Sequence, residues 1–192
     1  MKRFSRIICV AAVALMASAA PAMATRGQPD HFVPIEGTVI GEHWIIPQSE
    51  DCVPPPEAFD WWRFSSEGSG QMSHLGRIDY FLTQCTHVGL TGPISSGTIT
   101  FTAANGDTLV VAQSMISQLI GEMPFPDGFV GEGDWQVVDG TGRFTTATGF
   151  GTLDVIGDVP DGVAYFDDLP DGLARFDFSG AIVYDASDRS DK

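Results

Sequence analysis

The hydrophobic residues of this chain come in short runs in which apolar and polar positions alternate, and Gly or Pro separates the runs. The clearest example is residues 96–115, SGTITFTAANGDTLVVAQSM, where two β-rich runs flank Asn105 and Gly106. This pair accepts the positive φ angles of a type I′ turn, so the stretch predicts a β-hairpin. Ile99 and Phe101 are expected to face the core, and the intervening threonines to face solvent.

Further runs rich in Val, Ile, Thr, Phe and Tyr predict strands at residues 31–46, 72–88, 134–140, 142–157 and 174–185. Residues 47–71 contain three consecutive prolines and predict a long surface loop, and residues 116–133 predict a break between strands. The pattern therefore predicts one all-β domain at residues 25–184. Its architecture is expected to be a single closed antiparallel β-barrel of about eight strands, with a β-sandwich as the alternative.

The glycine-rich residues 139–153, DGTGRFTTATGFGTL, are compatible in composition with either a ligand loop or a bent strand. A phosphate-binding loop needs a helix after its glycines and usually a Lys, whereas Thr and Phe follow here. A barrel uses the same residues better, with a tight turn at 139–142 and Phe144 buried as a core anchor. Gly149 and Gly151 then relieve crowding where the strand bends or bulges to close the sheet.

Three of these segments together resemble a set of uncharacterised secreted bacterial proteins. The segments are SHLG at 73–76, TAANGD at 102–107 and GTGRFTTATGFGT at 140–152, and the resemblance extends over residues 72–184. That set is in turn similar to the allene oxide cyclase and dirigent barrels, which implies an eight-stranded antiparallel barrel of the calycin type. The resemblance also makes a homo-oligomer an expectation. The matching positions are glycines, Phe144 and turn residues, so no catalytic residue is carried over.

The N-terminal residues 1–24 are predicted to be a signal peptide, with Lys2, Arg3 and Arg6 before an apolar run and an Ala-Met-Ala site before Thr25. Removing them takes away three of the ten Lys and Arg and none of the 25 Asp and Glu, so the mature charge is −18. Such a surface repels phosphate backbones and anionic lipids, which argues against nucleic-acid binding and membrane insertion. The expected location is secreted or periplasmic in a bacterium, and the tail at 185–192 is predicted to be disordered.

Two cysteines remain in the mature chain, Cys52 in the predicted loop and Cys85 in the predicted strand at 72–88. In an oxidising compartment such a pair predicts one disulfide. In that strand the charged Arg77 and Asp79 share alternate positions with Cys85, which is therefore expected to point outward. The other set, which includes His74 and Tyr80, is expected to face inward.

Candidate chemistry is sparse. Seven aspartates at 154–177 offer oxygen atoms for calcium, but no calcium-loop motif is present and Pro-Asp-Gly turns explain two of the seven, so no metal or cofactor is predicted. Trp61 and Trp62 are expected to plug one end of the barrel or to form a partner-binding tip. The side chains predicted to line a small apolar cavity, or to fill it solid, are His74, Tyr80, Phe101, Trp135, Phe176 and Phe178.

These observations favour a secreted, non-catalytic barrel that binds a small apolar ligand or an envelope partner, or that has only a structural role. The alternative is a cyclase or isomerase of the allene oxide cyclase or dirigent kind, acting on a hydrophobic substrate with Tyr80 or His74 as its inward polar group. Whether the barrel has a cavity decides between a solid core and both ligand-dependent functions. A volume below about 100 Å³ would exclude them.

Overall fold

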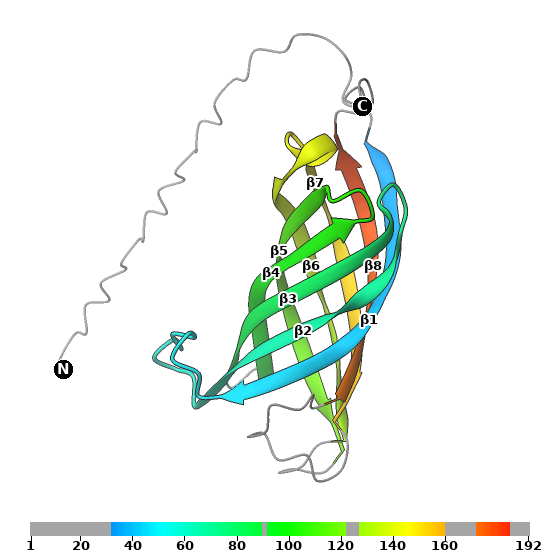
Figure 1. Cartoon of the computed structure of the whole chain (residues 1–192). Helices are drawn as coiled ribbons and strands as arrows, with labels where there is room; N and C mark the ends of the chain where they lie inside the picture. The colour runs from blue at the N-terminus through cyan, green and yellow to red at the C-terminus, as the bar shows by residue number, and fades with distance from the viewer. Residues whose placement is uncertain (1–31, 90–91, 122–126, 160–171, 185–192) are drawn as a thin grey trace, which may run out of the picture.

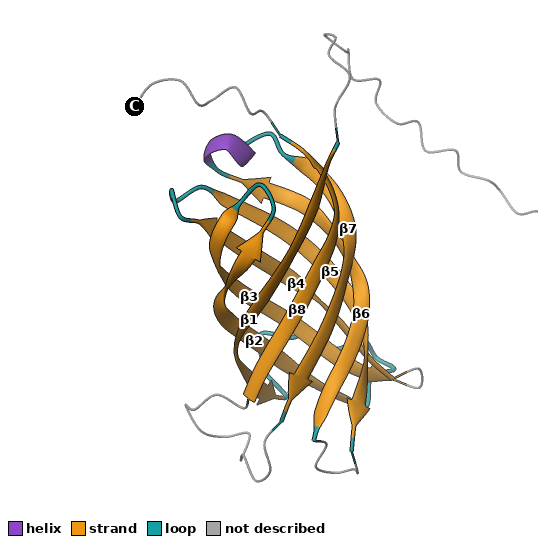
Figure 2. Ribbon diagram, turned by 90° about the vertical axis from the view of Figure 1, so that its right-hand side faces the viewer, coloured by secondary structure: helices purple, strands orange, loops and turns teal. Residues whose placement is uncertain are grey.

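The barrel is closed. In the computed structural model, which describes residues 32–89, 92–121, 127–159 and 172–184, eight antiparallel strands follow one another around it and β8 pairs with β1 (Figures 1 and 2). The strands are β1 (Val33–Pro47), β2 (Asp60–Met72), β3 (Gly76–Gly89), β4 (Gly92–Ala103), β5 (Thr108–Ile120), β6 (Gly128–Gly140), β7 (Thr148–Asp158) and β8 (Gly172–Val183). A short 3₁₀ helix, η1 (Gly142–Phe144), follows β6. The predicted eight-stranded barrel is confirmed, and the β-sandwich alternative is wrong.

Alternation along each strand places apolar side chains inside the barrel, as it does in β3, where Ile78, Tyr80 and Leu82 are buried. The same alternation puts Ile99 and Phe101 of β4 inside, as predicted. His74 departs from its prediction. It lies in the β2–β3 turn with a φ of 66° and is exposed, because the strand begins only at Gly76.

The long loop predicted at 47–71 is half as long as expected, because residues 60–71 belong to β2. The three consecutive prolines led to the prediction that the whole segment is a loop. In the barrel Gly68 and Gly70 face β1 at close range, and a Cβ at Gly68 would lie 2.2 Å from the Ile40 carbonyl oxygen. The predicted break at 116–133 is also shorter, since β5 continues to Ile120 and β6 begins at Gly128.

The hairpin between β4 and β5 is confirmed, but its turn type is not. The Gly106 amide donates to the Ala103 carbonyl oxygen, and Gly106 has a φ of 86°. Asn105 is not among the described residues with positive φ, which a type I′ turn requires at both central positions. The positive φ is confined to the glycine.

Glycines let the sheet close where an aromatic side chain lies across two strands. A Cβ at Gly151 would lie 2.0 Å from the Ser179 carbonyl oxygen and 2.6 Å from the Trp135 ring, and Gly180 faces the same ring at 2.5 Å. The Trp135 indole N–H donates to the Thr152 carbonyl oxygen at 3.0 Å and fixes the ring there. Gly151 therefore relieves crowding, as predicted, but the pairing of β7 with β6 and β8 continues without a bulge at this position.

The disulfide predicted between Cys52 and Cys85 is present, with a Cα–Cα distance of 5.5 Å. Cys85 points outward from β3, as expected, and the bridge holds the Gln48–Phe59 connection against the outer face of the barrel. A second tie joins the same connection to β2, where Arg63 forms an ion pair with Asp51.

Some predictions fall on residues that the structure does not describe. They are the signal peptide at 1–24, the tail at 185–192 and residues 160–171 of the aspartate-rich stretch at 154–177. Within the described part of the chain, no helix has the length and hydropathy needed to cross a membrane.

Candidate functional site

One end of the barrel, which we call the closed end, is filled by apolar side chains. It lies where β2 turns into β3 and where η1 follows β6, drawn uppermost in Figure 1. Phe144 of η1 is completely buried there and belongs to the same core cluster as Leu75 and Met72. Its ring lies 5.3 Å from the ring of Tyr184 at the end of β8. Phe144 is thus the core anchor predicted from the sequence.

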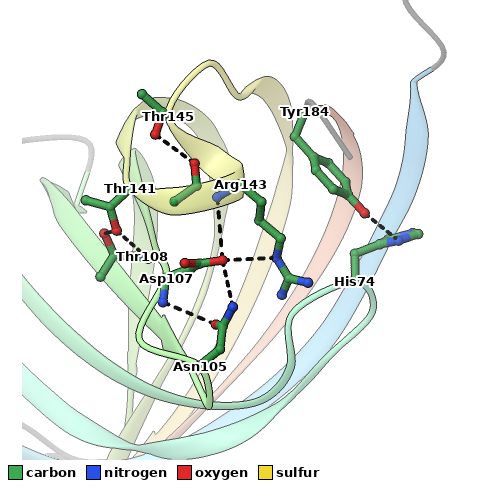
Figure 3. A network of polar contacts seen from close by, with 9 residues as sticks. His74, Asn105, Asp107, Thr108, Thr141, Arg143, Thr145 and Tyr184 are labelled. Carbon is green, nitrogen blue, oxygen red and sulfur yellow. Dashed lines mark hydrogen bonds and ion pairs between the residues drawn. The ribbon is translucent and has the colours of Figure 1, made fainter. Parts of the chain in front are cut away.

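Polar contacts fix η1 in place over this end (Figure 3). The Asp107 carboxylate accepts a hydrogen bond from the Asn105 side-chain amide at 2.8 Å and lies 3.7 Å from Nε of Arg143. It also crowds Gly142, whose φ is 56° and where a Cβ would clash with the carboxylate. The hydroxyl oxygen of Thr141 accepts a further hydrogen bond from the Thr108 backbone amide at 2.9 Å. The Gly-Thr-Gly-Arg segment is therefore a structural turn around Asp107.

His74 belongs to the closed end as well (Figure 3). With Nε2 protonated, it donates to the Pro34 carbonyl oxygen at 3.1 Å, and its Nδ1 accepts from the Tyr184 hydroxyl at 3.3 Å. Both ring nitrogens are thus engaged in holding the β2–β3 turn to the ends of β1 and β8. This arrangement gives His74 a structural role.

Buried aromatic rings pack against one another in the middle of the barrel. Phe101 and Phe178 meet edge to face at 5.2 Å, and Tyr80 meets Phe176 at 6.0 Å. The Tyr80 hydroxyl forms a 2.7 Å hydrogen bond with Ser66, and burial raises the pKa of Tyr80 to about 12. At neutral pH this hydroxyl is therefore protonated and already has a partner.

The opposite end, which we call the cavity end, contains a cavity of about 280 Å³. It lies where β1, β3, β5 and β7 finish and where the other four strands begin. Apolar and aromatic side chains make up most of its lining: Ile45, Pro47, Trp62, Phe64, Pro93, Met115, Leu119, Phe129, Val159 and Phe176. The remaining lining residues are Asp60, Gln84, Thr86, Ser95 and Ser117.

Neutral polar groups gather on the part of the wall formed by β3, β4 and β5. Thr86 and Ser95 are directly opposite each other on β3 and β4, and their hydroxyls form a buried 2.8 Å hydrogen bond. In the adjacent row of inward side chains, Gln113 of β5 donates a hydrogen bond from its side-chain nitrogen to the side-chain oxygen of Gln84 on β3. Gly97 lies between these two glutamines in the sheet and leaves room for them to meet.

Charge is nearly absent from the cavity wall. Among the described lining residues Asp60 is the one with a charged side chain, and it is exposed. No described group of three or more His, Cys, Asp or Glu is arranged to hold a metal ion. The cavity therefore offers apolar surface and hydrogen bonds, without a cation that would attract an anionic ligand.

His43 lies beside the cavity, completely buried on the inner face of β1. Its ring stacks on Phe64 at 5.1 Å and meets the edge of Phe129 at 5.6 Å. Neither ring nitrogen has a hydrogen-bond partner among the described residues. Burial lowers the pKa of His43 to about 4, and the nearby charge of Asp158 opposes this only in part. His43 is therefore neutral at neutral pH.

The predicted lining residues divide among these three regions. Phe176 reaches the cavity, whereas Tyr80, Phe101, Trp135 and Phe178 fill the packed middle and His74 is exposed at the closed end. Sequence analysis missed the polar wall. The signal was present as polar residues at inward positions of predicted strands, of which Gln84 and Gln113 are the clearest.

The two tryptophans of the predicted loop have separate places. Both belong to β2, where Trp62 lines the cavity and Trp61 lies opposite His87, on the outer face with Arg63 and Cys85. Trp62 thus forms part of the wall at one end of the barrel instead of filling that end.

No protein-family model matches this sequence, and a search of curated proteins gives no match. Among solved structures, the chain is similar to a pterocarpan synthase dirigent protein, with 13% sequence identity and a TM-score of 0.42. The alignment covers 89% of this chain and 99% of that protein. The eight-stranded barrel rests on the strand pairing alone, and the expected resemblance to the allene oxide cyclase and dirigent barrels stays a prediction. No role of any cavity residue is taken from it.

Proposed function

We propose that this protein is a secreted, non-catalytic β-barrel that binds a small, largely apolar molecule in the cavity at the cavity end. The observation that carries the proposal is the cavity itself. Its volume of about 280 Å³ lies close to the lower end of the roughly 300–1,000 Å³ usual for ligand pockets. It is also well above the roughly 100 Å³ that would exclude a ligand.

The lining supports an apolar ligand. Trp62, Phe64, Phe129 and Phe176 contribute rings from β2, β6 and β8, and such rings bury large apolar areas on contact with a ligand. The packed middle blocks passage along the barrel axis beyond Phe176, so the cavity is a pocket of one end. Secretion is proposed on the disulfide between Cys52 and Cys85, because disulfides persist in oxidising compartments.

Catalysis has less support than binding. The cyclase or isomerase alternative relied on Tyr80 or His74 as an inward polar group, and neither lines the cavity. Tyr80 is bonded to Ser66 with a raised pKa, and His74 is exposed at the other end. A proton-transfer step on a bound substrate needs a group within hydrogen-bond reach of it.

Fluorescence titration with the uncharged probe N-phenyl-1-naphthylamine tests the proposal. The native protein is expected to bind the probe saturably, with a Kd in the micromolar range. Replacing Leu119 by Trp fills the cavity from β5 and is expected to weaken binding at least tenfold. The matched control Gln118→Trp places the same ring on the outer face of β5 and should leave the Kd unchanged.

Two results would contradict the proposal. One is the absence of saturable probe binding to the native protein. The other is equal affinity of the native protein and the Leu119→Trp variant, because the probe would then sit on the outer surface. Circular dichroism of both variants checks that the barrel is intact.

A further inference from the structure

The cavity has two chemically different walls. Four aromatic rings form one wall, from Trp62, Phe64, Phe129 and Phe176. The other consists of neutral polar side chains on the inner faces of β3, β4 and β5, in two adjacent rows. The first row holds Thr86 and Ser95, and the second holds Gln84 and Gln113 on either side of Gly97. These four side chains are at most 7% exposed, so few of their polar atoms are available to bulk water.

The hydrogen bonds of the glutamine row do not balance. An amide side chain has two N–H donors and one acceptor oxygen. Gln113 donates to the oxygen of Gln84, which leaves Gln113 Oε1 buried without a partner. It also leaves the amino group of Gln84 with no hydrogen bond inside the described part of the protein. The leftover amino group belongs to Gln84 only in this orientation, because turning both amides would keep the bond but exchange the groups and place Gln84 Oε1, an acceptor, at the cavity.

The unbonded groups differ in their access to the cavity. Gln84 lines the cavity, whereas Gln113 lies behind it and is not among the lining residues. The hydroxyls of Thr86 and Ser95 both line the cavity and use one proton between them, so one O–H is left over. With Gln84 in this orientation, the polar wall offers an amino group and one hydroxyl proton to a bound molecule.

We propose that the natural ligand carries an uncharged carbonyl group. This inference rests on the function proposed above and names the chemical class of its ligand. A ketone, ester, lactone or neutral amide oxygen would accept from Gln84 Nε2 and from the Thr86–Ser95 hydroxyl pair. The apolar body of the ligand would then lie against the aromatic wall. A carboxylate is disfavoured, because no described lining residue is a cation and the sequence carries a net charge of −15.

Competition against N-phenyl-1-naphthylamine with three matched compounds tests this inference. The compounds share a naphthalene body and differ in one substituent: 2-acetylnaphthalene has a carbonyl, 2-ethylnaphthalene has none, and 2-naphthoate is an anion. We expect 2-acetylnaphthalene to bind at least as tightly as 2-ethylnaphthalene, although it is the less hydrophobic of the two. We expect 2-naphthoate to bind at least about tenfold more weakly than either.

Variants of the polar side chains that line the cavity provide the second part of the test. The double variant Gln84→Met/Gln113→Met removes both partners of the buried bond, so neither amide is left alone. It should weaken 2-acetylnaphthalene binding about tenfold, the ordinary effect of one neutral hydrogen bond, with 2-ethylnaphthalene unchanged. Thr86→Val/Ser95→Ala tests the hydroxyl row in the same way if the first variant does not fold. Gln118→Met on the outer face of β5 is the matched control.

The outcomes separate this inference from the proposed function. If 2-ethylnaphthalene binds more tightly than 2-acetylnaphthalene and both variants leave that order unchanged, the carbonyl proposal is overturned and the cavity remains a general apolar site. Equal binding of 2-naphthoate would overturn the exclusion of anions. If neither neutral compound nor the probe binds, the proposed function itself fails.

Discussion

The closed end of the barrel is filled by Phe144 of η1, Leu75 of the β2–β3 turn and Met72 of β2, whereas inward positions of β3 and β4 at the cavity end hold Gln84, Thr86 and Ser95 among the apolar lining. Both ends are built from the same eight strands with the same inward and outward alternation. The same alternation therefore surrounds a packed interior at one end and a cavity at the other. Barrels of eight strands have just enough interior to be filled by side chains or to hold one small ligand. In this chain, side chains fill the barrel at the closed end and leave room for a small ligand at the cavity end.

The two ends also treat polar groups differently. At the closed end the Asp107 carboxylate accepts a hydrogen bond from Asn105, and Arg143 Nε, although buried without a hydrogen bond, lies 3.7 Å from the same carboxylate (Figure 3). At the cavity end Gln113 Oε1 and both nitrogens of His43 are buried without partners among the described residues. Unsatisfied buried groups reduce stability, so the cavity end is expected to contribute less to it than the closed end.

The largest expected effect comes from truncating the anchor of the closed end. Phe144→Ala removes a completely buried ring and should lower the free energy of unfolding by about 4 kcal/mol. Leu119→Ala at the cavity end removes a half-buried side chain that already borders empty space, and should cost about 1 kcal/mol. Urea unfolding followed by tryptophan fluorescence measures both. Equal losses would show that the two ends are packed alike.

Acid should weaken the protein through His43. The unfolded chain takes up a proton at this residue near pH 6.5, whereas the folded protein does so only near pH 4. Stability is therefore lost as the pH falls from about 6.5 to about 4, and this residue contributes no further change below that. At about 1.4 kcal/mol per pH unit the loss approaches about 3 kcal/mol.

The comparison with His43→Phe isolates this contribution from that of the carboxylates. Urea unfolding of both proteins at a series of pH values between 4 and 7 gives the difference in their free energies of unfolding. The difference should change in favour of the variant as the pH falls. A difference that does not vary with pH would mean that the ring of His43 meets water in the folded state.

The contrast between the two ends explains which features the sequence predicted. Phe144, the Asn105–Gly106 hairpin and the Cys52–Cys85 bridge depend on local pattern or on a pair of residues, so they could be found without coordinates. The serine- and glycine-rich part of β2 was taken for a loop, because the close approach that requires Gly68 depends on β1, far away in the sequence.

The cavity was harder to predict for a similar reason. Alternation tells which side chains face inward but not at what height along the barrel they lie, and height decides whether a ring fills the middle or borders empty space. The cross-strand registers that set this height place Phe176 at the cavity and Phe178 in the packed middle. His74 was misplaced because the start of β3 is set by Gly76, which has a φ of 76° in the turn.

A pair of glycine substitutions tests whether crowding also differs between the two halves. Gly151→Ala pushes a Cβ into the Ser179 backbone and the Trp135 ring, and should lower the free energy of unfolding by about 2 kcal/mol. Gly89→Ala at the cavity end meets nothing within 4 Å, and should change stability by less than about 0.5 kcal/mol. Thermal unfolding by circular dichroism would rank the two, and a loss as large at Gly89 would contradict the difference.

The smallest expected effect is an enlargement that the cavity accepts. Leu119 and Val111 both face inward from β5, but Leu119 lines the cavity and Val111 is 1% exposed in the packed half. Leu119→Phe adds atoms where there is room and should change the free energy of unfolding by less than about 1 kcal/mol, whereas Val111→Phe should cost about 2 kcal/mol through overpacking. Because the two sites share a strand and a face, differences in strand propensity largely cancel. If urea unfolding shows that Leu119→Phe is as costly as Val111→Phe, the space at the cavity end is not free to accept a side chain, and a ligand would meet the same resistance.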